Sequence, residues 1–277
     1  TRLLAEQVRP QIDKVVAALF QRIPCGVGSH GGIGKVSHRD LDSVVTNGAA
    51  WAVERGFGSR SHLDAIEDGG RLPGADPMMV SDRAKERGLE QIGTLGSGNH
   101  FAELGVVEEI FHPQAAEEFG LTPGGITLMI HTGSRGFGYQ VCDDYLKVMA
   151  RAIRQYGITL PDRQLACSPV ESSEGKAYLA AMACAANFAF ANRQAITGLA
   201  EQALMDSLHL GTGEVGLRLV YDVSHNIAKI EEHLVSGKPR KLCVHRKGAT
   251  RAHLPRGSRS AWRYGQPAIG PGDMGSR

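Results

Sequence analysis

Apolar side chains recur every three or four residues in several stretches of the chain, which is the spacing that places them on one face of a helix. This pattern predicts helices over residues 12–23 and 141–153, and the alanine-rich stretch 177–204 is typical of a long buried helix. A capping box at residues 37–40 predicts a further helix that runs through Trp51.

Other stretches alternate apolar and polar residues, which is the period of a strand with one buried face. Strict alternation from Val215 to Val223 predicts such a strand, and residues 100–110 and 126–131 also have the character of strands. A turn at residues 236–239 predicts a hairpin. The chain is therefore predicted to be α+β, a single large domain in which helices flank a mixed β-sheet core.

The composition narrows the class of protein. Hydrophobic residues make up 42% and charged residues 22%, so the chain can bury a substantial core. Lys and Arg number 31 against 29 Asp and Glu, a net charge of +2 that excludes a histone-like polybasic protein but leaves room for a local cationic groove. Glycine accounts for 35 of 277 residues, about 13% against a usual share of about 7%. We therefore expect glycines in turns and in sites built from backbone.

The cysteines and the chain start bear on the compartment. Five scattered cysteines without a C-x-x-C pair predict reduced thiols rather than a disulfide framework or a zinc ribbon. Residues 1–7 have no signal-peptide character, and no apolar run approaches the roughly 20 residues that span a bilayer. The sequence therefore predicts a cytoplasmic protein without membrane association.

A first glycine-rich loop matches G-x-G-x-x-G at Gly26, Gly28 and Gly31. That pattern binds dinucleotides when a strand precedes it and a helix follows it. Here a predicted helix precedes the loop. We therefore interpret it as a flexible loop on the substrate side rather than a dinucleotide site.

A second loop carries more chemistry. Three glycines between residues 93 and 98 allow a close approach to a ligand, and an amide, an imidazole and a carboxylate follow them. With a strand period of two, Asn99, Phe101 and Glu103 share one face while His100 faces the other way. The segment could then hold a metal on one side and a nucleotide on the other. A glycine turn with a core histidine is an equally good interpretation of this stretch alone.

Two further histidines stand at the ends of predicted strands. His131 precedes a Gly-Ser-Arg-Gly turn in which Arg135 could contact an oxyanion, and His225 precedes Asn226. Together with His100 they form a set of imidazoles that suits Zn, Mn, Co or Fe. A solvated arginine in a tight turn is the alternative for Arg135.

The last third of the chain ends in a basic and glycine-rich segment. Cations crowd residues 245–263, and glycines follow through residue 275. Cations beside exposed backbone suit a polyanion such as RNA or a triphosphate. A solvated cationic loop is the simpler alternative.

Five of these motifs occur in an order that resembles the RtcB family of tRNA-splicing RNA ligases. They are residues 93–101, 131–136, 224–226, 246–250 and 271–275. The resemblance implies a ligase, dependent on GTP and Mn²⁺, that joins RNA ends carrying a 2′,3′-cyclic phosphate or 3′-phosphate to 5′-hydroxyl ends. In the family a histidine is guanylylated, GMP passes to the RNA 3′-phosphate, and the 5′-hydroxyl then displaces GMP.

The resemblance also assigns residues, with two manganese ions expected per site. It places metal ligands at His100, His131 and His225. It places nucleotide contacts at Asn99, His100, Phe101, Ala102, Glu103, His225, Asn226, Pro271, Gly272, Asp273 and Met274, with Glu103 reading the guanine edge. It places RNA-phosphate contacts at Arg87, Arg135, Arg246 and Lys247.

The match departs from the family at three points. Asp and Cys ligands in a D-x-G-C-G-like motif would precede Thr1, and the guanylylated histidine of an H-G-A-G-R-like motif would follow Arg277. Asp273 stands where many members have Ser. The resemblance thus implies the central part of a catalytic domain, partial at both ends and lacking the nucleophile, so the chain alone is expected to be inactive. An inactive RNA- or nucleotide-binding fragment and a metal-dependent phosphohydrolase are the alternatives.

Overall fold

The computed structural model describes residues 1–162 and 164–250, which form two compact units. The first unit consists of Thr1–Glu109 and Pro123–Ser224. The second consists of Ile110–Thr122 and the described residues from His225 onward. The described chain consists of helices and small antiparallel sheets, which confirms the predicted α+β class.

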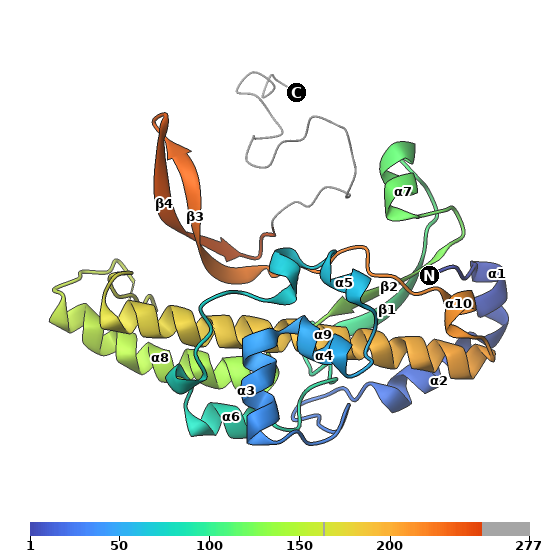
Figure 1. Ribbon diagram of the computed structural model, residues 1–277, viewed down its shortest axis with the longest axis horizontal. Coiled ribbons are helices and arrows are strands. Elements are labelled where there is room, and N and C mark those ends of the chain that lie inside the picture. The colour runs from blue at the N-terminus through green and yellow to red at the C-terminus, as the bar shows by residue number, and fades with distance from the viewer. Residues whose placement is uncertain (163, 251–277) are drawn as a thin grey trace. The chain divides into compact units, whose positions relative to one another are not determined.

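The first unit is organised around α9 (Ser173–Leu208), which confirms the long alanine-rich helix predicted from the sequence (Figure 1). The helix begins after Ser172, whose hydroxyl accepts a hydrogen bond from the backbone N–H of Gly175 at 3.1 Å. Because alanine projects only a methyl group, other helices approach the α9 backbone closely. The principal ones are α2 (Ile12–Arg22), α3 (His38–Asn47), α4 (Ala49–Glu54) and α8 (Arg135–Gln155).

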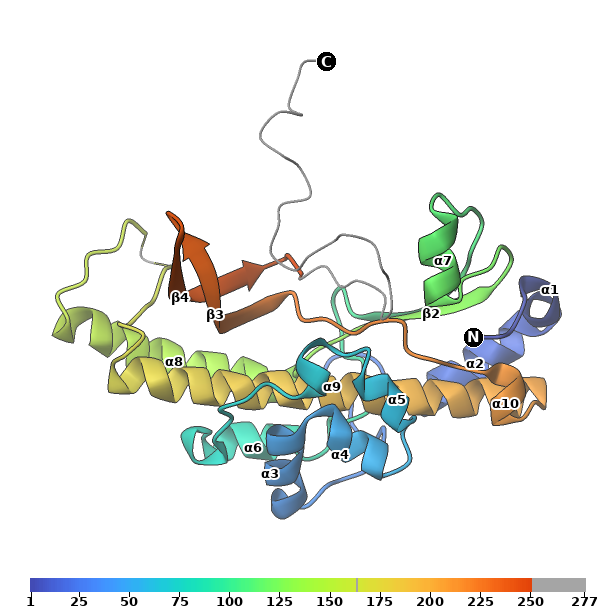
Figure 2. The same ribbon diagram turned by 45° about the horizontal axis from the view of Figure 1, so that its top comes forward.

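Helix α8 runs antiparallel to the first half of α9, as both ribbon views show (Figures 1 and 2). The rings of Phe137 and Phe188 stack with their centroids 5.1 Å apart, and those of Tyr145 and Tyr178 lie 5.5 Å apart. The later residue of α8 thus meets the earlier residue of α9, which shows that the two helices run in opposite directions. Phe137 and Phe188 are fully buried, so this contact forms the centre of the core.

The remaining helical elements are short. In the first unit they are α1 (Ala5–Val8), α5 (Arg60–Leu63), α6 (Asp82–Gly88), α10 (Thr212–Val215) and three 3-10 turns at Arg9–Gln11, Glu67–Gly70 and Pro77–Met79. The second unit contains α7 (Pro113–Phe119). No helix in the described part of the chain combines the length and the apolar composition needed to cross a bilayer.

Each unit contains one two-stranded antiparallel sheet rather than a share of the mixed sheet that the sequence predicted. In the first unit, β1 (Phe101–Val106) pairs with β2 (Ile126–His131), with Phe101 opposite His131. In the second, β3 (Asn226–Val235) and β4 (Lys238–Lys247) form the predicted hairpin. Its turn is shorter than predicted, because Ser236 and Gly237 alone adopt positive φ angles (51° and 76°), as two-residue hairpin turns require.

The predicted helix through Trp51 is interrupted at Gly48. α3 ends at Asn47 and α4 begins at Ala49, while Gly48 has φ 59° and ψ −135°. A Cβ at this position would overlap the carbonyl oxygen of Gly70, so the close approach of that distant loop requires glycine here. Ser37 is confirmed as the N-cap of α3, since its Oγ accepts from the Asp40 N–H at 3.0 Å.

The strand predicted from Val215 to Val223 is wrong. Val215 ends α10, Gly216 adopts a left-handed conformation, and the following residues run extended without a continuous partner. Their one bridge joins Asp222 to Ile66. Alternation reports which side chains are buried, but a strand also needs a neighbouring backbone along its length. His225 consequently precedes β3 instead of ending a strand.

Candidate functional site

His100 and His131 are brought together by the pairing of β1 with β2. His131 is the last residue of β2, as predicted, and His100 immediately precedes β1. Because Phe101 lies opposite His131, the two imidazoles become neighbours, with ring centroids 5.6 Å apart and planes inclined at 70°. Antiparallel pairing thus assembles two predicted metal ligands that are 31 residues apart in the sequence.

Backbone carbonyls fix the orientation of both rings. Nδ1 of His100 lies 2.9 Å from the carbonyl oxygen of Leu95, and Nδ1 of His131 lies 2.9 Å from that of Asn99. A carbonyl can only accept a hydrogen bond, so Nδ1 is the donor in each ring and Nε2 is the ring atom through which a metal would bind. Metal-binding histidines commonly have this arrangement. The donor set therefore fits a divalent transition metal such as Mn²⁺.

The exposed face of the β1–β2 sheet adjoins the histidine pair. Ala102 and Ile130 pack towards the core, whereas Phe101 and Glu103 are exposed, so the predicted alternation along β1 is confirmed. The ring of Phe101 meets that of His131 edge-on at 5.6 Å. Sequence alternation placed His100 on the opposite face, but this residue precedes the strand and its ring reaches His131. An aromatic ring therefore adjoins the His131 imidazole, and a carboxylate follows two residues further along the same face of β1.

The two glycine loops contact each other and enclose Arg135. The Gly26 N–H donates to the carbonyl oxygen of Gly96 at 2.6 Å, in a loop that follows a helix and has no preceding strand. Arg135 donates from Nε to Thr94 Oγ1 at 3.0 Å and from Nη2 to Ser29 Oγ at 3.1 Å. A Cβ at Gly96 would overlap this guanidinium. Burial lowers the pKa of Arg135, whose side chain acts here as an internal bridge.

Arg87 differs from Arg135 in its surroundings. It lies exposed in the last turn of α6, with its guanidinium 5.7 Å from the centre of the Tyr139 ring. Exposed cations on aromatic rings keep their charge accessible to solvent. Of the two predicted phosphate-binding arginines in the first unit, Arg87 is the more exposed.

The remaining predicted residues belong to the second unit or lie outside the described chain. His225 accepts at its carbonyl from the Gly248 N–H at 2.7 Å, and Asn226 accepts from the same N–H at 3.2 Å. Arg246 donates to Glu231 at 2.9 Å and its side chain is only 13% exposed, whereas Lys247 is exposed. Residues 271–274 lie outside the described residues. Among the described residues, no group of three or more His, Cys, Asp or Glu side chains is arranged to hold a metal ion.

Two polar residues of α9 that the sequence patterns did not single out hold the loops near the histidines. The buried Asn192 donates to the carbonyls of Thr94 and Gly133. The half-buried Arg193 donates to the carbonyl of Thr132 at 3.1 Å and to Asp222 at 2.7 Å. Burial raises the pKa of Asp222, and the positive charge of Arg193 opposes that rise. The signal available in the sequence was the polar run at residues 192–194 within an alanine-rich helix.

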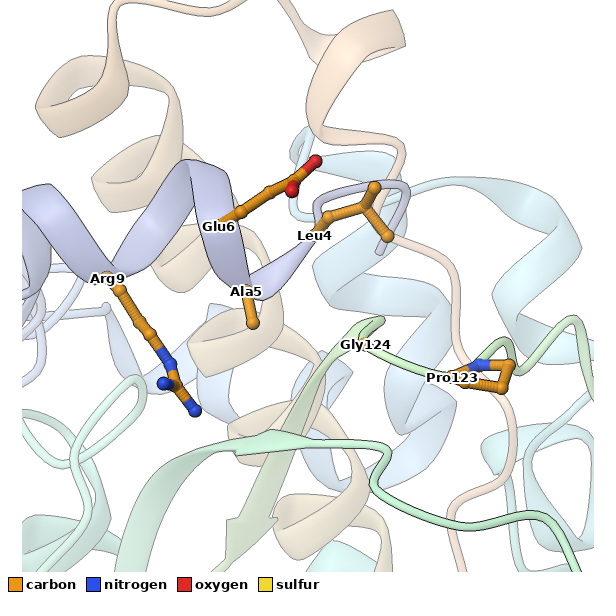
Figure 3. A pocket seen from close by; sticks show the side chains of 6 residues that line it. All are labelled: Leu4, Ala5, Glu6, Arg9, Pro123 and Gly124. Atoms are coloured by element: carbon orange, nitrogen blue, oxygen red, sulfur yellow. The ribbon is translucent and has the colours of Figure 1, made fainter.

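Two hollows in the described part of the first unit are lined by residues other than His100 and His131. One of about 380 Å³ is lined by Leu4, Ala5, Glu6, Arg9, Pro123 and Gly124 (Figure 3). Another of about 400 Å³ lies beside His62 and Glu201. Neither hollow is lined by a predicted site residue.

Comparison with known proteins gives one consistent result. The family model described as tRNA-splicing ligase RtcB matches residues 1–277. Proteins of that name from Archaeoglobus fulgidus, Pyrococcus horikoshii and Methanocaldococcus jannaschii are 49%, 50% and 47% identical to this chain and cover all of it. The chain spans 58%, 32% and 29% of their respective lengths.

Proposed function

The chain belongs to the RtcB family of tRNA-splicing ligases, and we propose that it contributes the metal- and nucleotide-binding part of an RNA ligase. The proposed reaction joins a 2′,3′-cyclic phosphate or 3′-phosphate RNA end to a 5′-hydroxyl end and consumes GTP with Mn²⁺. The observation that carries this proposal is the pair His100 and His131, whose rings adjoin and whose Nδ1 atoms both donate to backbone carbonyls.

The histidine pair supports the metal part of the proposal. Each ring donates from Nδ1 to a backbone carbonyl, so Nε2 is the atom proposed to bind the metal, and His225 is proposed as a third ligand. When bound, Mn²⁺ ions would neutralise phosphate charge and polarise the phosphorus–oxygen bonds. The role of the protein is to hold the imidazoles in one tautomer and orientation before the metal arrives.

The exposed face of β1 supports the nucleotide part. Phe101 and Glu103 lie on the same face, about 7 Å apart along the strand. An aromatic ring of this kind offers a stacking surface for a purine base. A carboxylate can accept from both N–H donors on the guanine edge, which adenine does not present in the same pattern. This arrangement favours GTP over ATP.

The basic residues support the RNA part to different degrees. Arg87 and Lys247 are exposed and can reach phosphates. Arg135 and Arg246 are engaged with Thr94 and Glu231, respectively. We therefore propose Arg87 and Lys247 as the principal RNA-phosphate contacts in the described part of the chain. No residue of the chain is proposed as the guanylylated nucleophile.

The proposal is tested with the full-length gene product, radiolabelled GTP, Mn²⁺ and a pair of RNAs that carry a 3′-phosphate and a 5′-hydroxyl. We expect a labelled protein adduct and a joined RNA, with both lost in His131→Ala. The matched control is His38→Ala, which replaces an exposed histidine in the first turn of α3. This control should retain both activities.

Three outcomes would contradict the proposal. One is a wild-type protein that forms neither adduct nor joined RNA. Another is a His131→Ala variant that ligates as well as the control. The third is release of phosphate from cyclic-phosphate RNA without joining, which would instead identify a metal-dependent phosphohydrolase.

A further inference from the structure

Asn192 is the most fully used hydrogen-bonding side chain near the histidine pair. It is fully buried in α9. Its Oδ1 accepts from the N–H groups of Gly93 and Thr94 at 2.8 and 3.2 Å. Its Nδ2 donates to the carbonyl oxygens of Thr94 and Gly133 at 3.1 Å each. A carboxamide has two donors and two acceptor positions, so all four are occupied here.

The backbone groups bound by Asn192 belong to the two segments that carry the histidines. Gly93 and Thr94 precede Leu95, whose carbonyl orients His100, and Gly133 lies two residues after His131. The two segments also meet at Leu95 itself, because Thr132 Oγ1 donates to the same carbonyl oxygen at 2.7 Å. Asn192 therefore ties together the segments whose relative position determines the distance between the imidazoles.

Few other side chains could fill this position. An aspartate has the same shape, but it would present an oxygen to the carbonyls of Thr94 and Gly133, and two acceptors repel each other. A leucine would leave four buried backbone groups without their partner. The position thus requires an amide. Its oxygen must accept from the N–H groups of Gly93 and Thr94, and its nitrogen must donate to the carbonyls of Thr94 and Gly133.

We propose that Asn192 is a positioning residue for metal binding, acting through the Gly93–Leu95 and Thr132–Gly133 segments to hold His100 and His131 in register. The proposal rests on the proposed function, since it takes the histidine pair to be a metal site. Asn192 itself touches neither imidazole. Its contribution is to keep the two carbonyl-bound rings at a fixed separation.

The same helix provides a matched control. Asn187 is also fully buried in α9, and it holds a different loop by the same kind of contact. Its Oδ1 accepts from the Leu72 N–H at 2.7 Å, and its Nδ2 donates to the carbonyls of Val45 and Leu72 at 2.9 and 3.1 Å. None of these groups belongs to the segments that carry His100 and His131. Asn187→Asp therefore introduces a comparable repulsion without disturbing the imidazoles.

The experiment compares Asn192→Asp, Asn187→Asp and the wild-type protein. Mn²⁺ affinity is measured by titration with the metal alone, and the histidine tautomers are measured by ¹⁵N NMR without metal. We expect Asn192→Asp to weaken Mn²⁺ binding by about 10- to 100-fold, the range seen when outer partners of a metal ligand are lost. We also expect it to perturb the ¹⁵N signals of His100 and His131. Asn187→Asp should leave both measurements as in the wild type.

The two measurements separate the inference from the function on which it rests. If the wild-type protein does not bind Mn²⁺, the proposed function fails, while the tautomer measurement still tests the role of Asn192. Equal losses of affinity in the two asparagine variants would show a general structural effect and overturn the proposal. Unchanged affinity and unchanged histidine signals in Asn192→Asp would overturn it as well.

A second variant keeps the proposal falsifiable if Asn192→Asp does not fold. Thr132→Val removes the hydroxyl that donates to the Leu95 carbonyl but preserves Asn192 and nearly the same volume. We expect it to reduce Mn²⁺ affinity about tenfold, at the lower end of the same range. Wild-type affinity in this variant would show that the connection through Leu95 does not position His100.

Discussion

Thr132 and His100 donate hydrogen bonds to one shared acceptor, the carbonyl oxygen of Leu95, at 2.7 and 2.9 Å. Thr132 follows the last residue of β2, and His100 precedes the first residue of β1. A single carbonyl therefore links the two strand ends where the imidazoles meet. This connection explains how a sheet of only two strands can hold two imidazoles in a defined arrangement.

His100 and His131 should belong to one metal site that needs both imidazoles. We expect His100→Ala and His131→Ala each to weaken Mn²⁺ binding by more than about 100-fold, because a lost ligand should cost at least as much as a lost outer partner. The double variant should be little weaker than either single variant, since the first substitution already destroys the site. Calorimetric titration checks this, with His38→Ala as the control. Strictly additive losses would indicate two separate sites.

Gly48 should tolerate no side chain. Its φ of 59° and the nearby carbonyl oxygen of Gly70 leave no room for a Cβ, so Gly48→Ala should lower the free energy of unfolding by at least about 2 kcal/mol. Gly213→Ala is the control, because a Cβ there meets nothing within 4 Å. Urea denaturation of both variants gives the comparison. Similar midpoints would mean that the loop at Gly70 moves away readily.

Arg135 should be more important for stability than Arg87. Lysine cannot reproduce the fork that reaches both Thr94 and Ser29, so Arg135→Lys should cost about 1–3 kcal/mol of unfolding free energy. The exposed Arg87 should tolerate lysine with a change within about 0.5 kcal/mol. Thermal and urea unfolding measure both. An equal effect at the two positions would contradict the bridging role of Arg135.

For RNA binding, Arg87 should be more important than Arg135. Arg87→Gln removes an exposed cation, so it should weaken RNA binding at low salt and reduce the slope of log affinity against log salt by about 1. Filter binding at several salt concentrations measures this slope. The control is Arg39→Gln, which removes an exposed cation from α3, a segment with no predicted RNA contact. An unchanged slope in Arg87→Gln would remove this residue from the RNA interface.

Acid should destabilise the fold partly through His62. Burial lowers the pKa of this imidazole, which is 4% exposed and lies 3.1 Å from the Gln194 amide nitrogen. The unfolded chain takes up the proton near pH 6.5, and the folded chain does so only at lower pH. The stabilisation is therefore complete above about pH 6.5 and is lost as the pH falls through the folded pKa.

Replacing His62 tests this pH dependence directly. The variant His62→Gln has no such group to titrate, so its free energy of unfolding should change less than that of the wild type between about pH 7.5 and pH 5.5. Urea unfolding at both pH values measures the difference. Parallel pH profiles for the two proteins would exclude His62 as the source.

The elements that the sequence identified correctly depend on contacts within a few residues. The α2 pattern, the cap at Ser37 and the alanine-rich α9 follow from the helical period and from side chains that bond to nearby backbone. The hairpin of β3 and β4 follows from its turn residues. The motifs around His100 and His131 were likewise recognisable locally, as was the family they indicate.

Distant parts of the chain determined the rest. Gly48 interrupts a helix because a loop 22 residues later approaches it. Residues 216–223 form no continuous strand because, in the described part of the chain, a neighbouring backbone bridges them only at Asp222. Asn192 resembled one more polar residue in a long helix until its four backbone partners were in view. The sequence by itself determined the family, the longer helices and the candidate ligands. Only the tertiary structure decided that His100 and His131 meet and that Asn192 holds their loops, because these relationships depend on pairing and packing between residues far apart in the chain.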